Sequence, residues 1–163
     1  MTSIRMMGIQ HNSVVDGKGI RDTIFVSGCP HHCSGCHNPE TWNILNGTPT
    51  TLSNILSQLN LRCDLTLSGG EPFMQAKELT EFLLEYKKYK VIPNIWIYSG
   101  YLFEELISDP DRLELLKLCN VLVDGRFDID KKEYGLKFRG SSNQRIIDVQ
   151  KSLKENKVVL LDI

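Results

Sequence analysis

The sequence has no long apolar run, no excess of one charge and no even set of cysteines. No stretch approaches the roughly 18 apolar residues that indicate a membrane-spanning helix. The N-terminal segment MTSIRMMGIQH has no apolar core of the kind found in a secretory signal. We therefore expect a chain without a membrane partner that works in the reducing cytoplasm.

The charges nearly cancel, which argues against a bulk basic surface. Lysine and arginine number 19 and aspartate and glutamate 20, for a formal net charge of -1. No nucleic-acid partner is therefore expected. Hydrophobic residues make up 41% and charged residues 24% of the 163 residues, which is ordinary for a folded chain. This length predicts one domain over residues 1–163.

Strand and helix patterns alternate along the chain. Strand patterns cover residues 22–28, 64–68, 94–99 and 121–123, with further candidates at 145–149 and 158–162. Helical spacing of apolar residues covers 52–59 and 79–86 and restarts at 103, where Asp109-Pro110 should interrupt it. The alternation predicts an α/β fold with a mainly parallel sheet.

Four loop segments follow the ends of predicted strands. They are a cysteine-bearing loop, Gly69-Gly70-Glu71, Ser99-Gly100 and Asp124-Gly125. Parallel α/β sheets and barrels bind ligands at the edge formed by the carboxyl ends of their strands. The spacing therefore predicts one shared site built from four separated segments.

Five cysteines are present, and three of them lie within eight residues. Cys29, Cys33 and Cys36 form a C-x3-C-x2-C pattern, whereas Cys63 and Cys119 are isolated and are expected to be buried structural thiols. An odd number of cysteines does not indicate a disulfide framework. Three thiolates can hold three corners of a cubane iron–sulfur cluster and leave the fourth iron open to a substrate. The alternative is a zinc site completed by one of the three nearby histidines, His31, His32 or His37.

The cysteine pattern, followed by Gly69-Gly70-Glu71 after the next predicted strand, resembles the radical S-adenosylmethionine superfamily. The resemblance implies that the three cysteines hold a [4Fe-4S] cluster. It implies that S-adenosylmethionine chelates the fourth iron through its amino and carboxylate groups. Gly69, Gly70 and Glu71 would meet the methionine amino group, and the backbone around His37 would line the same pocket.

Further segments resemble the activators of glycyl radical enzymes, and among them the branch that serves anaerobic ribonucleotide reductase. The matching segments are 15–21 (VDGKGIR), 34–38 (SGCHN), 98–101 (YSGY), 123–127 (VDGRF) and 138–148 (FRGSSNQRIID). Gly35 occupies a position where the superfamily often has an aromatic residue, and a glycine there is familiar in this branch. The short chain implies a partial, incomplete βα barrel that is open on one side.

The resemblance implies a function as well as a fold. The cluster would reduce S-adenosylmethionine to methionine and a 5′-deoxyadenosyl radical, which would take hydrogen from a glycine of the large reductase subunit. A flavodoxin-type protein would supply the electron. The alternatives are an activase of another glycyl radical enzyme, of the pyruvate formate-lyase type, and a small zinc-binding interaction module.

Four charged residues near these loops are further candidates. Asp16 and Arg139 are candidates for contact with the substrate peptide, against the alternative that Asp16 only shapes a turn. Asp124 and Arg126 are candidates for the ribose or the carboxylate of S-adenosylmethionine, against a surface salt bridge. Asp124 and Arg126, together with Gly35 and Cys36, complete the expected cofactor site.

Overall fold

Seven strands form one sheet in the computed structural model, which describes residues 1–163. In the order β3-β1-β2-β4-β5-β6-β7, the strands are Thr48–Thr51, Ser3–Ser13, Arg21–Val26, Asp64–Gly69, Ile95–Tyr98, Val121–Asp124 and Arg145–Asp148. The sheet has two edges, at β3 and β7, and beyond β7 there is only an isolated bridge between Ile147 and Leu160.

The expectation of a mainly parallel sheet is wrong, because the sheet is mixed. The four central strands β2, β4, β5 and β6 run parallel, but β1 pairs antiparallel with both β2 and β3, and β7 pairs antiparallel with β6. The physical reason lies in the connections. A seven-residue loop after β1 is too short for a crossover, so β2 returns beside β1 in the opposite direction.

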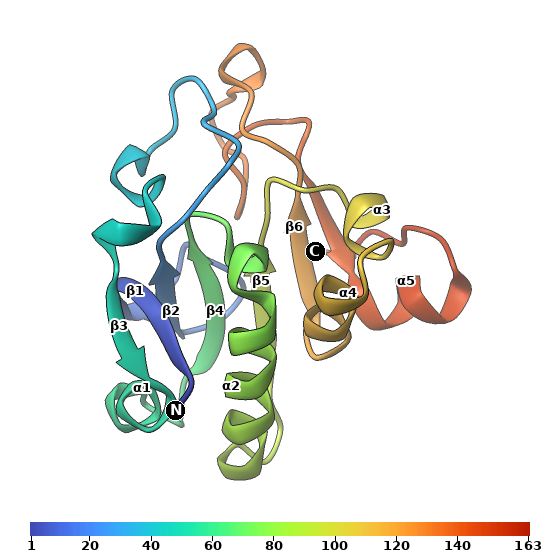
Figure 1. Cartoon of the computed structure of the whole chain (residues 1–163). Helices are drawn as coiled ribbons and strands as arrows, with labels where there is room; N and C mark the ends of the chain where they lie inside the picture. Colours follow the sequence, from blue (N-terminus) through green and yellow to red (C-terminus); the bar gives the residue numbers. More distant parts are fainter.

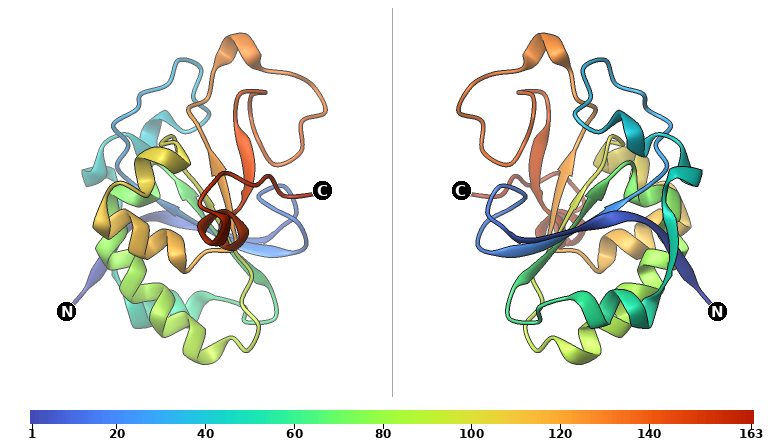
Figure 2. Two further views of the ribbon diagram at one scale, coloured as in Figure 1. Left: turned by 90° about the vertical axis from the view of Figure 1, so that its right-hand side faces the viewer. Right: turned by 90° about the vertical axis from the view of Figure 1, so that its left-hand side faces the viewer.

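Helices connect the parallel strands and cover one face of the sheet. The α-helices are α1 (Leu52–Gln58), α2 (Ala76–Tyr89), α3 (Phe103–Leu106), α4 (Pro110–Lys117) and α5 (Val149–Glu155). Short 3-10 turns occupy Pro39–Thr41, Ile44–Asn46, Pro72–Gln75 and Ile129–Lys131. Figures 1 and 2 show α1 to α4 on one side of the sheet and the long loop after β6 reaching toward the other side.

The helix α2 shows why these residues fold as they do. Leu79, Phe82, Leu83 and Tyr86 are buried and recur at the spacing of one helical face, as expected from the sequence. The break expected at Asp109-Pro110 is also present, because the Asp109 carboxylate caps the first turn of α4 by accepting from the amides of Asp111 and Arg112. These helices and the central strands contribute to one core cluster of 23 buried residues.

Four segments differ from the sequence expectation. Strands β1 and β3 and helix α5 are present where no element is expected, and the segment 158–162 contributes only the bridge at Leu160 instead of a strand. Cys63 and Cys119 are buried, as expected, with exposed fractions of 7% and 0%.

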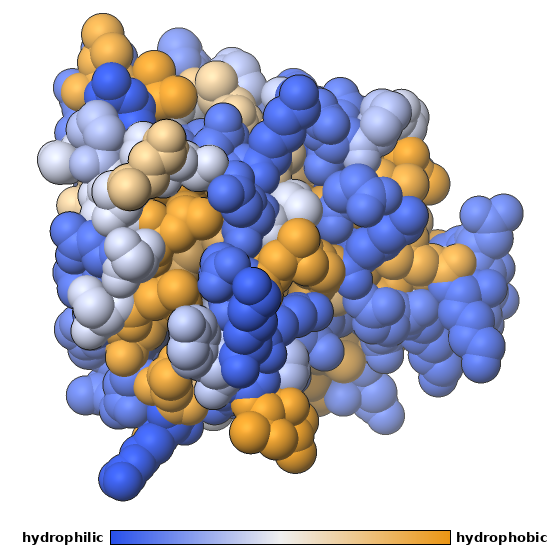
Figure 3. Space-filling model, turned by 60° about the horizontal axis from the view of Figure 1, so that its bottom comes forward, coloured by the Kyte–Doolittle hydropathy of each residue, from blue (hydrophilic) through white to orange (hydrophobic).

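The two ends of the sheet differ in character. The carboxyl ends of the parallel strands carry the long loops at the top of Figure 1, whereas the opposite end has short turns. Figure 3 shows that lower end, where apolar side chains lie exposed among polar ones; Val91 and Ile92, in the turn between α2 and β5, are largely exposed. No helix is long and apolar enough to cross a membrane.

The core of α2 allows a matched test of this packing. Leu83 is fully buried, while its neighbour Leu84 is about half exposed at 53%. We expect Leu83→Ala to lower the free energy of unfolding by about 2–5 kcal/mol, because it removes buried surface and leaves a cavity. Leu84→Ala should change it by less than about 1 kcal/mol. Urea unfolding followed by circular dichroism measures both, and equal losses would contradict the packing described.

Candidate functional site

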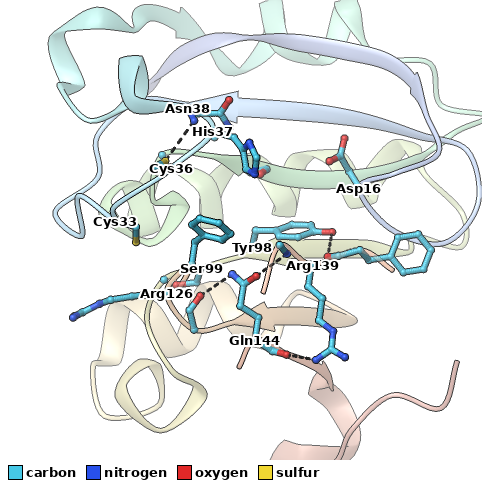
Figure 4. Close-up of a pocket in the computed structure, with 18 of the residues that line it drawn as sticks. Asp16, Cys33, Cys36, His37, Asn38, Tyr98, Ser99, Arg126, Arg139 and Gln144 are labelled. Carbon is cyan, nitrogen blue, oxygen red and sulfur yellow. Dashed lines mark hydrogen bonds between the residues drawn. The ribbon is translucent and has the colours of Figure 1, made fainter. Parts of the chain in front are cut away.

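A cavity of about 760 Å³ lies at the carboxyl ends of the parallel strands. It is lined by parts of six segments, which fall within residues 14–16, 29–41, 68–70, 98–100, 125–127 and 136–144. The structure therefore brings together the four loops that the sequence places after strand ends. In Figure 4, Cys33 and Cys36 lie at one end of this cavity and Asp16 at the other, with Tyr98 between them.

Cys29, Cys33 and Cys36 all line the cavity and are partly exposed. The loop begins on Gly28, whose amide donates to the carbonyl of Thr41 at 2.6 Å, and the amide of Cys29 donates to the carbonyl of Trp42. The amide of Asn38 donates to the sulfur of Cys36 at 3.4 Å, which orients that side chain within the loop. Burial raises the pKa of the Cys29 thiol, so a bound metal would have to supply the charge that draws off its proton.

The donor set fits an iron–sulfur cluster better than a single zinc ion. No three histidine, cysteine, aspartate or glutamate side chains are gathered at a point where they could hold one metal ion. A cubane binds its thiolates at separate corners, so its ligands need not meet at one point. Three thiols on one loop that opens into a cavity are therefore suited to a cluster with one accessible iron.

Of the three histidines of the loop, only His31 has both ring nitrogens in hydrogen bonds, whereas His32 and His37 make ring contacts that do not use their nitrogens. His31 Nε2 lies 2.7 Å from the Glu71 carboxylate. The ring of His32 stacks on Trp42 with 4.5 Å between centroids. His37 lines the cavity and packs at a tilt against Phe127.

Gly69 and Gly70 line the cavity and also allow backbones to pack closely. Gly69 has a φ of +111°, and a Cβ there would overlap the backbone of Val26. A Cβ on Gly70 would lie 2.5 Å from the carbonyl oxygen of Gly28, at the start of the cysteine loop. A side chain at Gly69 would thus displace the backbone of β2, and one at Gly70 would displace the start of the cysteine loop.

Glu71 does not line the cavity, and its side chain is fully buried. Its carboxylate receives hydrogen bonds from the hydroxyl of Ser99 at 2.9 Å, the amide of Gly100 at 2.8 Å and the amide of Phe73 at 3.1 Å, in addition to the contact with His31. This carboxylate therefore joins the cysteine loop to the ends of β4 and β5.

Asp124 and Arg126 lie in different environments. Asp124 is fully buried outside the cavity, where it accepts from the amide of Phe103 at 2.8 Å and from Arg145 at 2.6 Å. Hydrogen bonds to Asp124 and Glu104 raise the pKa of Arg145 further above its usual value. Arg126 lines the cavity, and its Nε donates to His31 Nδ1 at 3.2 Å.

Asp16 lines the far end of the cavity and is held by β2 and β4. Its Oδ2 accepts from the hydroxyls of Ser13 at 2.6 Å and Thr23 at 3.0 Å, and its carbonyl accepts from Thr66 at 2.8 Å. No hydrogen bond from the protein reaches its Oδ1, so that oxygen is free for a ligand.

Arg21 supports the Asp16 loop from below, and sequence reasoning gave it no role beyond the family resemblance. Its guanidinium is fully buried and donates to the hydroxyl of Thr66 at 2.8 Å and to the carbonyl of Lys18 at 2.6 Å. Burial lowers the pKa of Arg21 to about 10. The buried Arg21 guanidinium, by donating to the Lys18 carbonyl, restrains the loop that carries Asp16.

Arg139 lines the cavity, whereas Gly35, although it lies in the cysteine loop, does not. The Arg139 guanidinium lies at the cavity and donates to the carbonyls of Ser142 at 3.2 Å and Gln144 at 2.6 Å, so most of its bonding shapes its own loop. Tyr98 donates to the carbonyl of Phe138 at 2.7 Å and holds the same loop. Gly35, with a φ of +77°, has no room for a side chain beside Ile129 and Phe127.

Sequence reasoning gave no role to Ser99 or Tyr98, although both lie in the matched segment 98–101. Their position at the end of the predicted strand 94–99 places them at the same sheet edge as the cysteines, and this signal assigned Ser99-Gly100 to the shared site without a specific role.

Comparison with known proteins gives consistent results. A family model described as a 4Fe-4S single cluster domain matches residues 15–147. The anaerobic ribonucleoside-triphosphate reductase-activating protein of Escherichia coli (strain K12) is 37% identical over 140 residues, which cover 80% of this chain and 90% of that protein. The proteins of the same name from Vibrio cholerae and Enterobacteria phage T4 are 39% and 37% identical, covering 82% and 81% of this chain and 90% and 86% of their own.

Replacement of single cysteines tests the ligand set. We expect Cys29→Ala, Cys33→Ala and Cys36→Ala to bind far less than the about four irons per chain of a cubane after anaerobic reconstitution. Cys63→Ala is the matched control and should keep its iron, because that thiol is remote from the cavity. Iron and sulfide assays measure the difference, and full iron retention in Cys33→Ala would contradict the assignment.

The reactivity of the thiols tests their environments in the iron-free chain. Burial raises the pKa of the Cys119 thiol to about 12, so almost none of it is thiolate at pH 8. We expect iodoacetamide at that pH to modify Cys33 and Cys36 first, Cys29 more slowly and Cys119 last. Mass spectrometry of timed samples gives the order, and urea-unfolded chain should react equally at all five. Early modification of Cys119 in folded chain would contradict the burial.

Proposed function

This chain belongs to the family of anaerobic ribonucleoside-triphosphate reductase-activating proteins, with a 4Fe-4S single cluster domain, and we propose that it generates the glycyl radical of its reductase by reductive cleavage of S-adenosylmethionine. The observation that carries the proposal is the shared cavity. Three cysteines and the Gly69-Gly70 backbone, 33 or more residues apart in sequence, line one opening at the carboxyl edge of the sheet.

In this proposal Cys29, Cys33 and Cys36 hold three irons of a [4Fe-4S] cluster. With three thiolates from the chain, one iron would remain open to the cavity, where the amino and carboxylate groups of S-adenosylmethionine would bind. When bound, the cluster supplies one electron that cleaves the sulfonium bond and yields methionine and a 5′-deoxyadenosyl radical, which takes hydrogen from a glycine of the large reductase subunit. A flavodoxin-type protein is the proposed source of the electron.

The chain's own residues bind and orient. The carbonyls near Gly69 and Gly70 are available to accept from the methionine ammonium group. Arg126 lies at the cavity beside the cysteine loop, where its guanidinium can approach a carboxylate. Asp16, with one free oxygen at the far end of the cavity, is placed to meet the substrate peptide. Asp124 is given no contact with the cofactor in this proposal, because its oxygens are already bonded.

The volume of the cavity suits a cofactor. About 760 Å³ lies within the range of roughly 300–1,000 Å³ for small-molecule sites. The exposed side chains of Val14 and Val15 lie at its rim. A reductase loop that enters there would exclude water from the radical, which an active site must do.

Electron paramagnetic resonance tests the proposal. Reconstituted chain, S-adenosylmethionine, a reductant and the reductase subunit should give an organic doublet on the reductase under anaerobic conditions. Deuterium at the glycine α-carbon should appear in 5′-deoxyadenosine.

The control is Cys36→Ala, which should give neither signal, while Cys63→Ala should give both. Absence of the doublet, together with consumption of a small substrate by this chain alone, would contradict the activase function.

A further inference from the structure

Glu71 is a buried carboxylate without a lysine or arginine partner. Its side chain is 0% exposed, and its contacts are the donors on His31, Ser99, Gly100 and Phe73. A buried charge is costly unless hydrogen bonds compensate it. Moving any of these donors away from Glu71 would therefore cost free energy, so the segments that carry them are held in place. The resemblance to the superfamily implies a direct contact between this glutamate and a ligand, but its oxygens point into the protein.

His31 is the donor that comes from the cysteine loop. It lies between Cys29 and Cys33, and its side chain is 4% exposed. The ring meets Tyr101 edge-on with 4.5 Å between centroids, and a Cβ on Gly100 would overlap it. The ring is therefore enclosed on two sides by the segment after β5.

Arg126 determines which nitrogen of His31 carries the proton. A guanidinium can only donate, so His31 Nδ1 accepts from Arg126 Nε, at 3.2 Å. Nε2 then carries the proton and donates to Glu71 Oε1, at 2.7 Å. The chain Arg126–His31–Glu71 runs from the loop after β6, through the cysteine loop, to the end of β4.

We propose that His31 and Glu71 are positioning residues that hold the cysteine loop in its ligand-binding position before any cluster binds. A loop of this length would otherwise lose conformational freedom on binding iron, at a cost in affinity. The hydrogen bond between His31 and Glu71 orders the loop when the chain folds, because it joins the segment between two cysteines to the buried ends of β4 and β5. Iron binding then does not have to supply the free energy for that ordering. The inference rests on the proposed ligand role of the cysteines, but its first test needs no iron.

Hydrogen exchange of the iron-free chain provides that test. We expect His31→Leu to speed amide exchange in residues 29–36 by about tenfold, because a hydrogen bond to a buried charge is lost. Glu71→Gln should do the same, since an amide brings donors against the donors of Ser99 and His31. His31→Gln retains a donor of similar reach and should restore much of the protection.

His11→Leu is the matched control. Like His31, His11 pairs with a carboxylate: its Nδ1 lies 3.0 Å from Asp22 Oδ1. His11 lies on β1, however, and does not line the cavity. Exchange at residues 29–36 should be unchanged in this variant. Equal exchange in wild-type chain, His31→Leu and Glu71→Gln would overturn the proposal.

Two further readouts separate positioning from general stability. In wild-type chain, the nitrogen-15 resonances of His31 should show the proton on Nε2. Arg126→Met should remove this preference for Nε2. A proton on Nδ1 in wild-type chain would overturn the proposal. This measurement stands even if His31→Leu does not fold. After reconstitution, His31→Leu should bind fewer irons or give a shifted cluster signal in electron paramagnetic resonance, and His31→Gln should recover the wild-type signal.

The inference and the proposed function fail differently. A loop that is protected in wild-type chain and released in His31→Leu supports positioning even if no glycyl radical forms on the reductase. A radical that forms normally in both His31→Leu and Glu71→Gln, with unchanged exchange, overturns positioning and leaves the activase function in place.

Discussion

Glu71 places a negative charge where water does not reach, and the loops around the cavity are arranged to satisfy it. The carboxylate has no cation beside it, so backbone amides, a hydroxyl and an imidazole must share the charge. These donors come from the cysteine loop, the end of β5 and the turn after β4. One buried group therefore sets the relative positions of segments that are distant in sequence, and the cavity between them depends on it.

The sheet leaves this cavity open on one side. Antiparallel β1 and β7 flank the parallel centre, and the helices cover the opposite face, so the loops after β1 and β6 form the rim (Figures 1 and 2). A closed barrel would exclude a protein substrate, whereas an open edge admits a loop of a partner. Under the proposed function, the partner would have to exclude water from the radical at this open side.

The part of the fold that could be predicted from the sequence is the part with strong periodicity. Helix α2 and the central strands bury side chains at regular spacing, and the break at Asp109-Pro110 follows from proline geometry. Strand β1 gave no signal because only Ile4, Met6 and Ser13 of its residues are buried, and α5 buries only Val149 and Ser152. The wrong sheet type followed because β1 and β3 were not expected and because the strand expected at 145–149 pairs antiparallel with β6.

The candidate site divides in the same way, between residues whose role depends on spacing and residues whose role depends on tertiary partners. The cysteines and the double glycine follow strand ends, so their convergence was predictable from the order of elements. The sequence could not show that Arg145 would occupy the oxygens of Asp124, or that His31 and Ser99 would occupy those of Glu71. An acidic residue beside a glycine turn has the same sequence signature whether it faces a ligand or a buried donor, and only the packing of neighbouring strands distinguishes the two.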